Sequence, residues 1–316
     1  MKKILGVGTA LVDVICQVDD NIISGLNLSK GSMTLIEESQ IQKIRANFTD
    51  PLITSGGSVC NTVHELKLDS HEARFNGKVS DDEDGNAFIQ DLEKANISFK
   101  GVSRKSDLPT GCCNILVSPD GERTMATHIG IGSQLQPDEV SENILDNIDH
   151  MYMESYLWDH ELTKKTLKKF GDIARSKNIE ISLSLSDPFC VDRHRDELNN
   201  FIKENVDLVF CNFDEAKMFS QSETMADVSS FFKDYGKKIV MTSGAEGAYF
   251  FYNDDVSHQP SKKIENVIDT TGAGDNFAAG FLDFYLSGKS VDEALINGNT
   301  RAVEVIQQLG PRIKRA

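Results

Sequence analysis

Cysteine is too scarce in this chain to build a disulfide framework. The 316 residues include six cysteines at irregular spacing, and two of them, Cys112 and Cys113, are adjacent. A protein that depends on disulfides carries more cysteines in a shorter, loop-rich chain. The scarcity therefore excludes that class and favours a reducing compartment, which we expect to be the cytoplasm.

Positive charge is also scarce. There are 33 Lys and Arg against 49 Asp and Glu, which gives a formal net charge of −16. Such a chain repels phosphate backbones and anionic lipid surfaces unless it carries a local basic patch. The short basic runs at residues 164–169 and 312–315 contain no interleaved aromatics. We interpret them as a solvated helix face and a solvated terminus, and expect no nucleic-acid partner.

Long apolar runs are missing as well. No stretch approaches the roughly 18 uninterrupted apolar residues typical of a membrane-spanning helix, so we expect no membrane partner. What remains is an ordinary globular composition, with 39% hydrophobic and 26% charged residues. A chain of this length can bury a substantial core.

Short apolar runs alternate with longer helical patterns along most of the chain. This order is typical of βαβ units, and it predicts a doubly wound α/β fold with a mainly parallel sheet flanked by helices. We expect strands at residues 3–7, 151–153, 179–185, 208–211 and 238–242, and helices at 160–177, 193–205, 226–235, 275–286 and 291–309.

Two regions break this alternation and indicate antiparallel β structure, at about residues 12–37 and 97–128. The second contains the turn Ser118-Pro119-Asp120-Gly121 between two apolar segments. We expect both insertions to pair as one small sheet that forms a lid over a cleft. Because no repeat or flexible linker divides the chain, we predict a single domain over residues 1–316.

The most informative segment is DTTGAGDNF at residues 269–277, which leads into a predicted helix. Its glycines allow close approach of the backbone to a ligand, and the start of a helix attracts an anion such as phosphate. Asp275 would stay ionised beside the positive end of the helix and could take a proton from an attacking hydroxyl. The alternative is that Thr271 and Asp275 only cap the helix.

The whole segment resembles the signature of the ribokinase-like, or PfkB, family of sugar and nucleoside kinases. Other family motifs follow in the same order over nearly the whole chain. The resemblance implies a kinase that uses ATP and Mg²⁺. It further implies that Asp275 is the catalytic base, and that Gly272, Ala273 and Gly274 form an anion hole for the transferring phosphoryl group.

Gly56-Gly57-Ser58-Val59-Cys60-Asn61 is similar to the family's G-G-x-x-x-N element, whose glycines and asparagine meet the hydroxyls of the substrate. Asp13 matches the family aspartate that binds a vicinal diol. A carboxylate can accept hydrogen bonds from two neighbouring hydroxyls at once, and glycines let a sugar lie against the backbone. An ordinary loop, with Asn61 as a helix cap, is the alternative for Gly56 and Gly57.

Asn212 and Glu215 match the family's N-x-x-E motif, in which the acid orders Mg²⁺ through water molecules. Magnesium prefers oxygen ligands and keeps much of its water, so this indirect role suits a glutamate. A capping asparagine followed by an acid in the first helical turn would give the same letters. The position directly after a predicted strand favours the family interpretation.

Thr242, Gly244 and Gly247 match a T-x-G-x-x-G turn that lies beside the nucleotide in the family, and Asn299 occupies the position that borders the adenine. These resemblances imply an ATP site. A turn that only ends a strand is the alternative for the first group. A helix residue that faces solvent is the alternative for Asn299.

Arg123 lies in a segment similar to lid sequences of adenosine kinases, where an arginine reaches toward the transferring phosphoryl group. An arginine suits this role because it stays charged and can bind two oxygens. An exposed hairpin arginine is the alternative. Asp269 and Thr271 match positions near a monovalent-cation site in some relatives, which adds K⁺ as an optional cofactor; a structural role is the alternative.

The acceptor is expected to be a hydroxymethyl group of a nucleoside or a sugar. Segments 152–159 and 186–193 resemble bacterial adenosine kinase-like proteins, which places adenosine first and a free sugar such as ribose or fructose second. A non-catalytic sensor of nucleosides or sugars on the same fold is the alternative from another class. The lid can close over its own subunit or pair with the lid of a second subunit, so we expect either a monomer or a homodimer.

Overall fold

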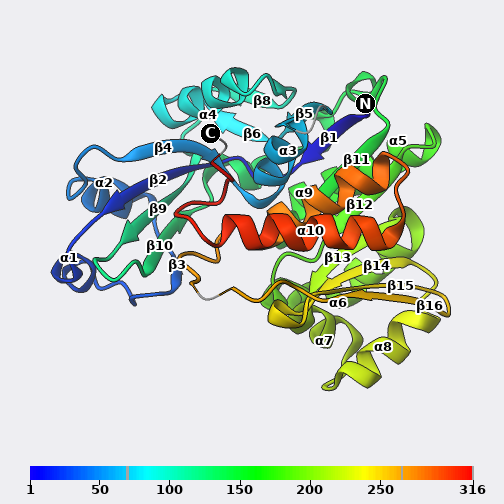
Figure 1. Ribbon diagram of the computed structural model, residues 1–316. Coiled ribbons are helices and arrows are strands. Elements are labelled where there is room, and N and C mark those ends of the chain that lie inside the picture. Colours follow the sequence, from blue (N-terminus) through cyan, green and yellow to red (C-terminus); the bar gives the residue numbers. More distant parts are fainter. Residues whose placement is uncertain (69–70, 265, 315–316) are drawn as a thin grey trace.

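The computed structural model describes residues 1–68, 71–264 and 266–314, and it contains a nine-stranded sheet between two helical layers (Figure 1). The strand order is β16-β15-β14-β13-β12-β11-β1-β5-β7. All pairings from β14 to β7 are parallel, and β15 and β16 are antiparallel additions at one edge. The strands are β1 (Lys3–Val7), β5 (Glu72–Asn76), β7 (Ser98–Phe99), β11 (His150–Glu154), β12 (Glu180–Ser184), β13 (Leu208–Asn212), β14 (Lys238–Thr242), β15 (Ala248–Tyr252) and β16 (Asp255–Gln259).

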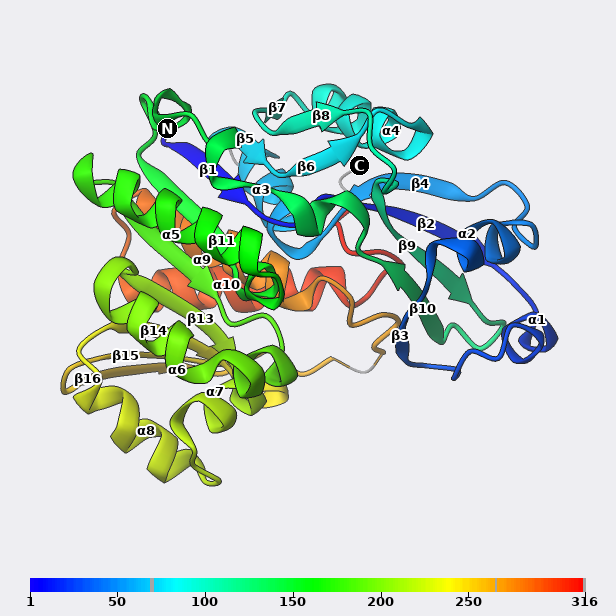
Figure 2. The same cartoon turned by 180° about the vertical axis from the view of Figure 1, so that it is seen from behind.

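Helices cover both faces of this sheet, which confirms the predicted doubly wound α/β fold. Ile4 packs in a cluster with residues of α3, α9 and α10, whereas the next residue, Leu5, packs with residues of α5 to α8. Figures 1 and 2 show these two layers from opposite sides. The helices are α1 (Asp20–Gly25), α2 (Glu38–Arg45), α3 (Ser58–Leu68), α4 (Glu83–Lys94), α5 (Glu161–Ser176), α6 (Pro188–Asn205), α7 (Phe213–Ser220), α8 (Met225–Asp234), α9 (Ala273–Leu286) and α10 (Val291–Val305).

Two predicted helix boundaries are wrong by more than two residues. α6 begins five residues early because Asp187 caps it, accepting hydrogen bonds from the N–H groups of Phe189 and Cys190. α10 ends at Val305 and not at Leu309. The carbonyl of Ile306 accepts hydrogen bonds from the N–H groups of residues 268 and 269, so this end of the helix is tied to the loop that precedes α9.

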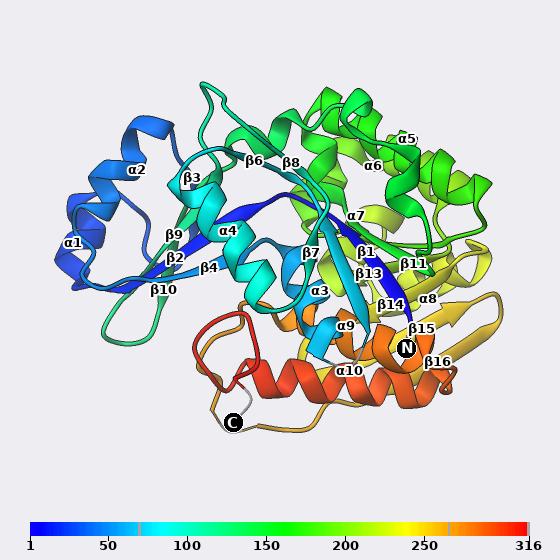
Figure 3. The same cartoon turned by 90° about the horizontal axis from the view of Figure 1, so that it is seen from above.

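The smaller sheet has the order β3-β10-β9-β2-β4 and projects to one side of the large sheet (Figure 3). The expectation of purely antiparallel pairing is wrong, because β2 pairs with β9 and β3 with β10 in parallel. α1 interrupts the first insertion, while β7 and β8 (Val102–Arg104) of the second lie outside this sheet; β8 pairs with β6 (Lys78–Ser80). The strands are β2 (Leu11–Gln17), β3 (Met33–Leu35), β4 (Leu52–Gly56), β9 (Gly111–Val117) and β10 (Arg123–His128).

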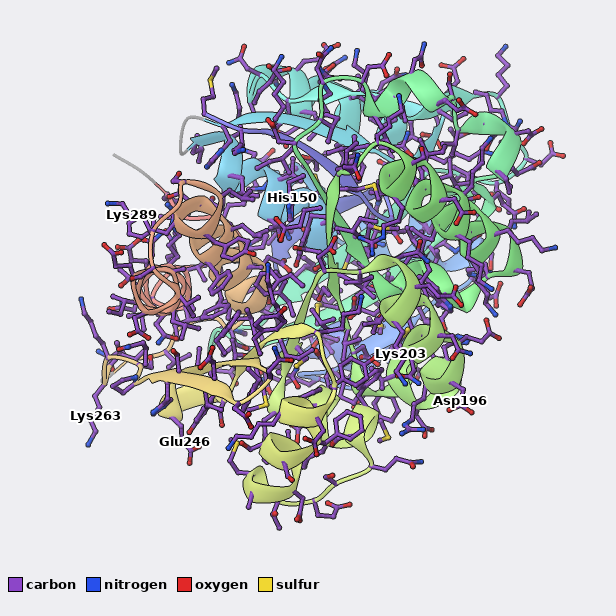
Figure 4. All side chains as sticks on the ribbon, turned by 90° about the vertical axis from the view of Figure 1, so that its right-hand side faces the viewer. His150, Asp196, Lys203, Glu246, Lys263 and Lys289 are labelled. Carbon is purple, nitrogen blue, oxygen red and sulfur yellow. The ribbon has the colours of Figure 1, made fainter. Side chains whose placement is uncertain are left out.

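Charged side chains lie mostly at the periphery. In Figure 4, Asp196, Lys203 and Glu246 lie at the outside, whereas His150 of β11 lies within the interior. The interpretation of the basic runs as solvated is wrong for two residues: Lys164 is buried and paired with Glu161 and Glu197, and Arg312 is largely buried beside Asp91. Lys165, Lys168 and Lys314 are exposed, as predicted. Arg315 lies outside the described residues. Within the described part of the chain, no helix combines the length and apolar character that crossing a membrane would require.

Candidate active site

One cavity of about 390 Å³ lies where the carboxyl ends of β11 to β14 meet the small sheet and the starts of α3 and α9. This is the edge at which doubly wound sheets bind their ligands. A larger surface hollow of about 730 Å³, between α6 and α7, contains none of the predicted site residues. The predicted residues that line the smaller cavity are Asp13, Gly57, Asn61, Asn212, Glu215, Thr242, Thr271, Gly272, Ala273, Gly274 and Asp275.

Asp275 stands half-buried in the first turn of α9, and its carboxylate is held from α3. Ser58 Oγ donates to Asp275 Oδ1 at 2.7 Å, and Asn61 Nδ2 donates to Asp275 Oδ2 at 3.1 Å. Burial raises the pKa of Asp275, and these two hydrogen bonds lower it in part. We expected the helix end to keep this carboxyl ionised, but burial is the largest effect and acts in the opposite direction. The carboxylate remains open to the cavity.

The start of α9 is shaped by Gly272. Its φ is +75°, and a Cβ added to it would lie 2.5 Å from the carbonyl oxygen of Pro311, so a larger residue would be both strained and crowded. Gly274 faces open space and is exposed. Ala273 N–H donates to Thr270 O at 3.2 Å, which closes a turn before the helix. The loop therefore presents backbone at the mouth of the cavity, and the C-terminal segment supports it from behind.

Asp13 lies on β2 and faces the cavity, while Gly56 lies behind it. A Cβ on Gly56 would come within 2.4 Å of the Asp13 carboxyl group, so the glycine makes room for this side chain. Gly57 has a φ of +95° and turns the chain into α3. Burial raises the pKa of Asp13 to about 6, and the nearby charges of Arg312 and Arg123 oppose that rise.

Asn212 and Glu215 form the reciprocal cap that the alternative interpretation described, and both also line the cavity. Asn212 Oδ1 accepts from Glu215 N at 2.8 Å, and Glu215 Oε2 accepts from Asn212 N at 3.0 Å. Burial raises the pKa of Glu215 to about 7. The described residues contain no group of three or more His, Cys, Asp or Glu placed to hold a metal ion.

Two of the remaining predicted nucleotide residues, Gly247 and Asn299, lie against the backbone of Gln259. A Cβ on Gly247 would lie 2.1 Å from Gln259 O, and Asn299 Nδ2 donates to the same oxygen at 2.9 Å. Asn299 is only 8% exposed, so the alternative of a solvent-facing helix residue is wrong. Thr242 ends β14 and lines the cavity, whereas Gly244, Gly247 and Asn299 do not.

Arg123 lies at the start of β10, buried and outside the lining of the cavity. Its Nη1 is 2.8 Å from Asp269 Oδ2, so the alternative of an exposed hairpin arginine is wrong. Asp269 Oδ1 also accepts from Thr271 N at 3.0 Å, and Oδ2 accepts from Gly310 N at 2.9 Å. The lid and the loop before α9 are therefore joined by a buried ion pair.

Three residues that hold the elements of the site in place were not among the predicted site residues. Ser58 lies inside the quoted glycine motif, three residues before Asn61 and thus on the same helix face, so helical spacing could have identified it. Glu154 accepts hydrogen bonds from Thr9 N at 2.7 Å and Val59 N at 3.1 Å, which anchors the start of α3; burial raises its pKa to about 7. Arg312 contacts Asn61 across 251 positions of sequence, and nothing local signals that contact.

Comparison with known proteins gives a consistent result. The model of the family described as "pfkB family carbohydrate kinase" matches residues 31–315. The structure titled as adenosine kinase from Sinorhizobium meliloti is 33% identical, covering 98% of this chain and 95% of the other, with a TM-score of 0.87. A probable sugar kinase from Rhizobium etli is 32% identical, covering 99% and 96%, with a TM-score of 0.89. Adenosine kinase 2 of Arabidopsis thaliana is 23% identical, covering 97% and 94%.

Proposed function

Because this chain belongs to the pfkB family of carbohydrate kinases and is an ATP-dependent kinase with an alcohol acceptor, we propose that it phosphorylates the hydroxymethyl group of a nucleoside, with adenosine as the first candidate. The observation that carries the proposal is the position of Asp275. Its carboxylate opens on the cavity at the start of a helix and is oriented by Ser58 and Asn61.

In this proposal, Asp275 accepts the proton of the acceptor hydroxyl as the hydroxyl oxygen forms its bond to the γ-phosphorus of ATP, while the bond from that phosphorus to the bridging oxygen breaks and ADP leaves. The backbone of Gly272, Ala273 and Gly274 contributes the anion hole at the positive end of α9. Asp13 and Asn61 orient the acceptor, with Gly57 beside them in the cavity lining and Gly56 behind Asp13. Bound ATP supplies the phosphoryl group, and bound Mg²⁺ neutralises negative charge on the phosphates.

The walls of the cavity support a nucleoside acceptor. Ile115 of β9 and Met125 of β10 form an apolar wall on the side of the small sheet, and Tyr156 adds an aromatic ring. An apolar slot of this kind suits a purine base, while Asp13 suits the diol of a ribose. A sugar kinase acting on ribose, fructose or a related sugar is the second candidate, because the similar Rhizobium etli protein is titled a probable sugar kinase.

The residues present fit a hydrated magnesium ion. Glu215 and Asn212 offer oxygen atoms at the carboxyl end of β13, and Mg²⁺ is held in such sites by few protein oxygens together with water and phosphate. We place ATP between this edge and the turn formed by Thr242, Gly244 and Gly247, with Asn299 toward the adenine. K⁺ is an optional cofactor, because Asp269, which would lie near the cation, already faces the guanidinium of Arg123.

We also propose that the small sheet serves as a lid over the site of its own subunit. Its outer face is covered by the same chain, because Val12 and Val14 of β2 pack with Ile23 of α1 and Ile41 of α2. β3, an edge strand of this sheet, leaves Leu35 64% exposed. The covered outer face favours a monomer, whereas the exposed edge strand is the surface on which a homodimer would pair, and sedimentation velocity would decide between them. A cytoplasmic location accords with the six free cysteines in the described residues.

A coupled ADP-release assay tests the function. Adenosine, guanosine, inosine, ribose and fructose are compared at fixed ATP and Mg²⁺, with and without K⁺. Turnover with adenosine at the highest kcat/KM supports the proposal, and preference for a free sugar replaces it with the second candidate. Binding of adenosine in calorimetry without ADP formation from any acceptor would instead indicate the non-catalytic sensor.

A further inference from the structure

We propose that Arg312, in the C-terminal segment, is a positioning residue that fixes the side-chain amide of Asn61 so that its NH₂ group faces Asp275. The inference rests on the proposed function of the site but concerns a residue that the family motifs do not include. It would make the C-terminal segment a part of the active site.

The backbone around Arg312 is anchored on both sides. After α10 the chain turns back toward β4 and α3, as Figure 1 shows. Gly310 N donates to Asp269 Oδ2 at 2.9 Å, and Pro311 O accepts from Asn276 Nδ2 at 2.7 Å. Ile313 N donates to Glu65 Oε1 at 3.3 Å. These contacts tie the segment to the loop before α9, to α9 itself and to α3.

The guanidinium group is bound by residues of three elements. Arg312 Nη1 donates to Asp91 Oδ2 of α4 at 3.0 Å, and Nη2 donates to Ser55 Oγ of β4 at 2.7 Å and to Ser55 O. Asp91 Oδ2 also accepts from Ser55 N and Oγ. With both terminal nitrogens held, Nε is directed at Asn61 Oδ1, at a longer 3.4 Å.

This contact decides which way the amide of Asn61 points. An amide has an acceptor end and a donor end, and their assignment follows from the partners. With Oδ1 toward Arg312, Nδ2 donates to Asp275 Oδ2 at 3.1 Å. In the flipped orientation, the NH₂ group would meet a guanidinium donor and Oδ1 would meet a carboxylate, so both contacts would be repulsive. Arg312 therefore selects the orientation that holds the proposed base.

Lysine cannot replace this arrangement. The planar guanidinium presents Nε and two terminal nitrogens in fixed directions, whereas an ammonium is a single point charge on a flexible stem. The charge of Arg312 has a further effect on the site, because it lowers the pKa of Asp13 against the rise caused by burial. A neutral replacement at position 312 thus alters both the geometry and the electrostatics of the acceptor side.

The test compares Arg312→Ala, Arg312→Lys and Asn61→Ala with the double variant of Arg312→Ala and Asn61→Ala. Arg301→Ala is the matched control, since Arg301 is also largely buried and paired with an aspartate, Asp283, but lies outside the cavity. We expect kcat of Arg312→Ala to fall by about tenfold to a hundredfold, with little change in the KM for ATP. The double variant should fall little below the poorer single variant, because the arginine acts through the asparagine. Guanidinium chloride should restore part of kcat in Arg312→Ala and none in Arg301→Ala.

Independent effects that multiply in the double variant, or an unchanged kcat in Arg312→Ala, would overturn the proposal. A readout without turnover separates this from failure of the proposed function. The side-chain NH₂ resonance of Asn61, assigned by its loss in Asn61→Ala, should exchange slowly with solvent in the wild-type protein and faster in Arg312→Lys. Equal exchange in both proteins rejects the positioning role even if no acceptor is turned over, whereas absence of ADP formation by the wild type rejects only the function.

Discussion

Ser58 Oγ donates a 2.7 Å hydrogen bond to Asp275 Oδ1, joining two residues that are 217 positions apart in the sequence. The contact connects the first turn of α3 to the first turn of α9, so the acceptor motif and the phosphate-binding loop share one carboxylate. Because Ser58 precedes Asn61 by three residues, both side chains reach Asp275 from the same face of α3. The helix thus holds the carboxylate of the proposed base in place with two hydrogen bonds.

Removal of this hydrogen bond should impair catalysis without unfolding the protein. We expect Ser58→Ala to lower kcat by about tenfold, since a hydrogen bond to a charged group contributes about 1.5–3 kcal/mol. The same bond lowers the pKa of Asp275, so its loss should move the acid limb of the kcat/KM profile to higher pH. Ser58→Thr, which keeps the hydroxyl, is the control. A profile that superimposes on that of the wild type would refute this role for Ser58.

Replacement of the base itself should be more severe. Asp275→Asn keeps the shape of the side chain but cannot accept a proton, and we expect kcat to fall by about 10²–10⁴-fold. The KM for ATP should change little, because the backbone of the loop is retained. Circular dichroism and thermal melting verify the fold of the variant. Wild-type turnover by a folded Asp275→Asn protein would contradict the assignment of the base.

Five of the nine strands of the large sheet were predicted from the sequence, because their information is local, whereas β5, β7, β15 and β16 were not. Buried parallel strands give continuous apolar runs, and β1 and β14 have the predicted bounds while β11, β12 and β13 differ by one residue at one or both ends. α5 and α8 were equally clear, since an amphipathic pattern repeats along them. The small sheet was less predictable, because its parallel pairings join strands that are far apart in the chain and depend on α1 and α2, which cover its outer face.

Some residues of the candidate site could also be predicted from the sequence, and others could not. The residues of the glycine motifs could be predicted because backbone conformation demands them, as the positive φ of Gly57 and Gly272 shows. The partners of Arg123 and Arg312 could not, because each pairs with an acid from a distant element. Both arginines were interpreted from short segments, and one of them as solvated, although charged side chains this far from water require partners that only the tertiary structure supplies.

The ionised carboxylate of Asp13 should destabilise the folded protein, although the proposed function needs it to bind the acceptor. Its pKa is raised to about 6 in the folded protein from an ordinary value of 3.8, so the free energy of unfolding falls as the pH rises from about 4 to about 6, and the full cost of the ionised carboxylate is present above pH 6. We expect Asp13→Asn to raise the free energy of unfolding by about 1–3 kcal/mol at pH 8 and to change it little at pH 4, where the wild-type carboxyl is largely protonated. Urea unfolding at both pH values measures this difference.

The same variant should lose most of its acceptor binding, because an amide cannot accept hydrogen bonds from two hydroxyls in the manner of a carboxylate. The KM for the nucleoside should rise while the KM for ATP is retained. Asn114→Asp, a change elsewhere on the small sheet, would introduce a buried charge outside the cavity lining and should destabilise the protein. If Asp13→Asn raised the free energy of unfolding equally at pH 4 and at pH 8, the charge of Asp13 would not be the cause of the increase in stability.

The ion pair between Arg123 and Asp269 predicts the response to monovalent cations. Both side chains are buried, and Arg123 Nη1 lies 2.8 Å from Asp269 Oδ2. Removal of one partner leaves a buried charge, so Arg123→Met should lower the free energy of unfolding by about 3–5 kcal/mol. Since the guanidinium already neutralises the carboxylate that would bind K⁺, we expect K⁺ to change wild-type ADP formation little. Arg123→Met should instead be stimulated by K⁺.

The decisive measurement is a K⁺ titration at constant ionic strength, with choline chloride as the balancing salt. Addition of Asp269→Asn to Arg123→Met removes the uncompensated carboxylate, so the double variant should regain stability and lose its K⁺ response. Because Asp269 also accepts hydrogen bonds from Thr271 N and Gly310 N, the recovery will be partial: an amide oxygen can keep one of these bonds, but its NH₂ group cannot accept the other. Strong K⁺ activation of the wild type would show that the arginine does not stand in for the cation, and that Asp269 exchanges its partner when K⁺ binds.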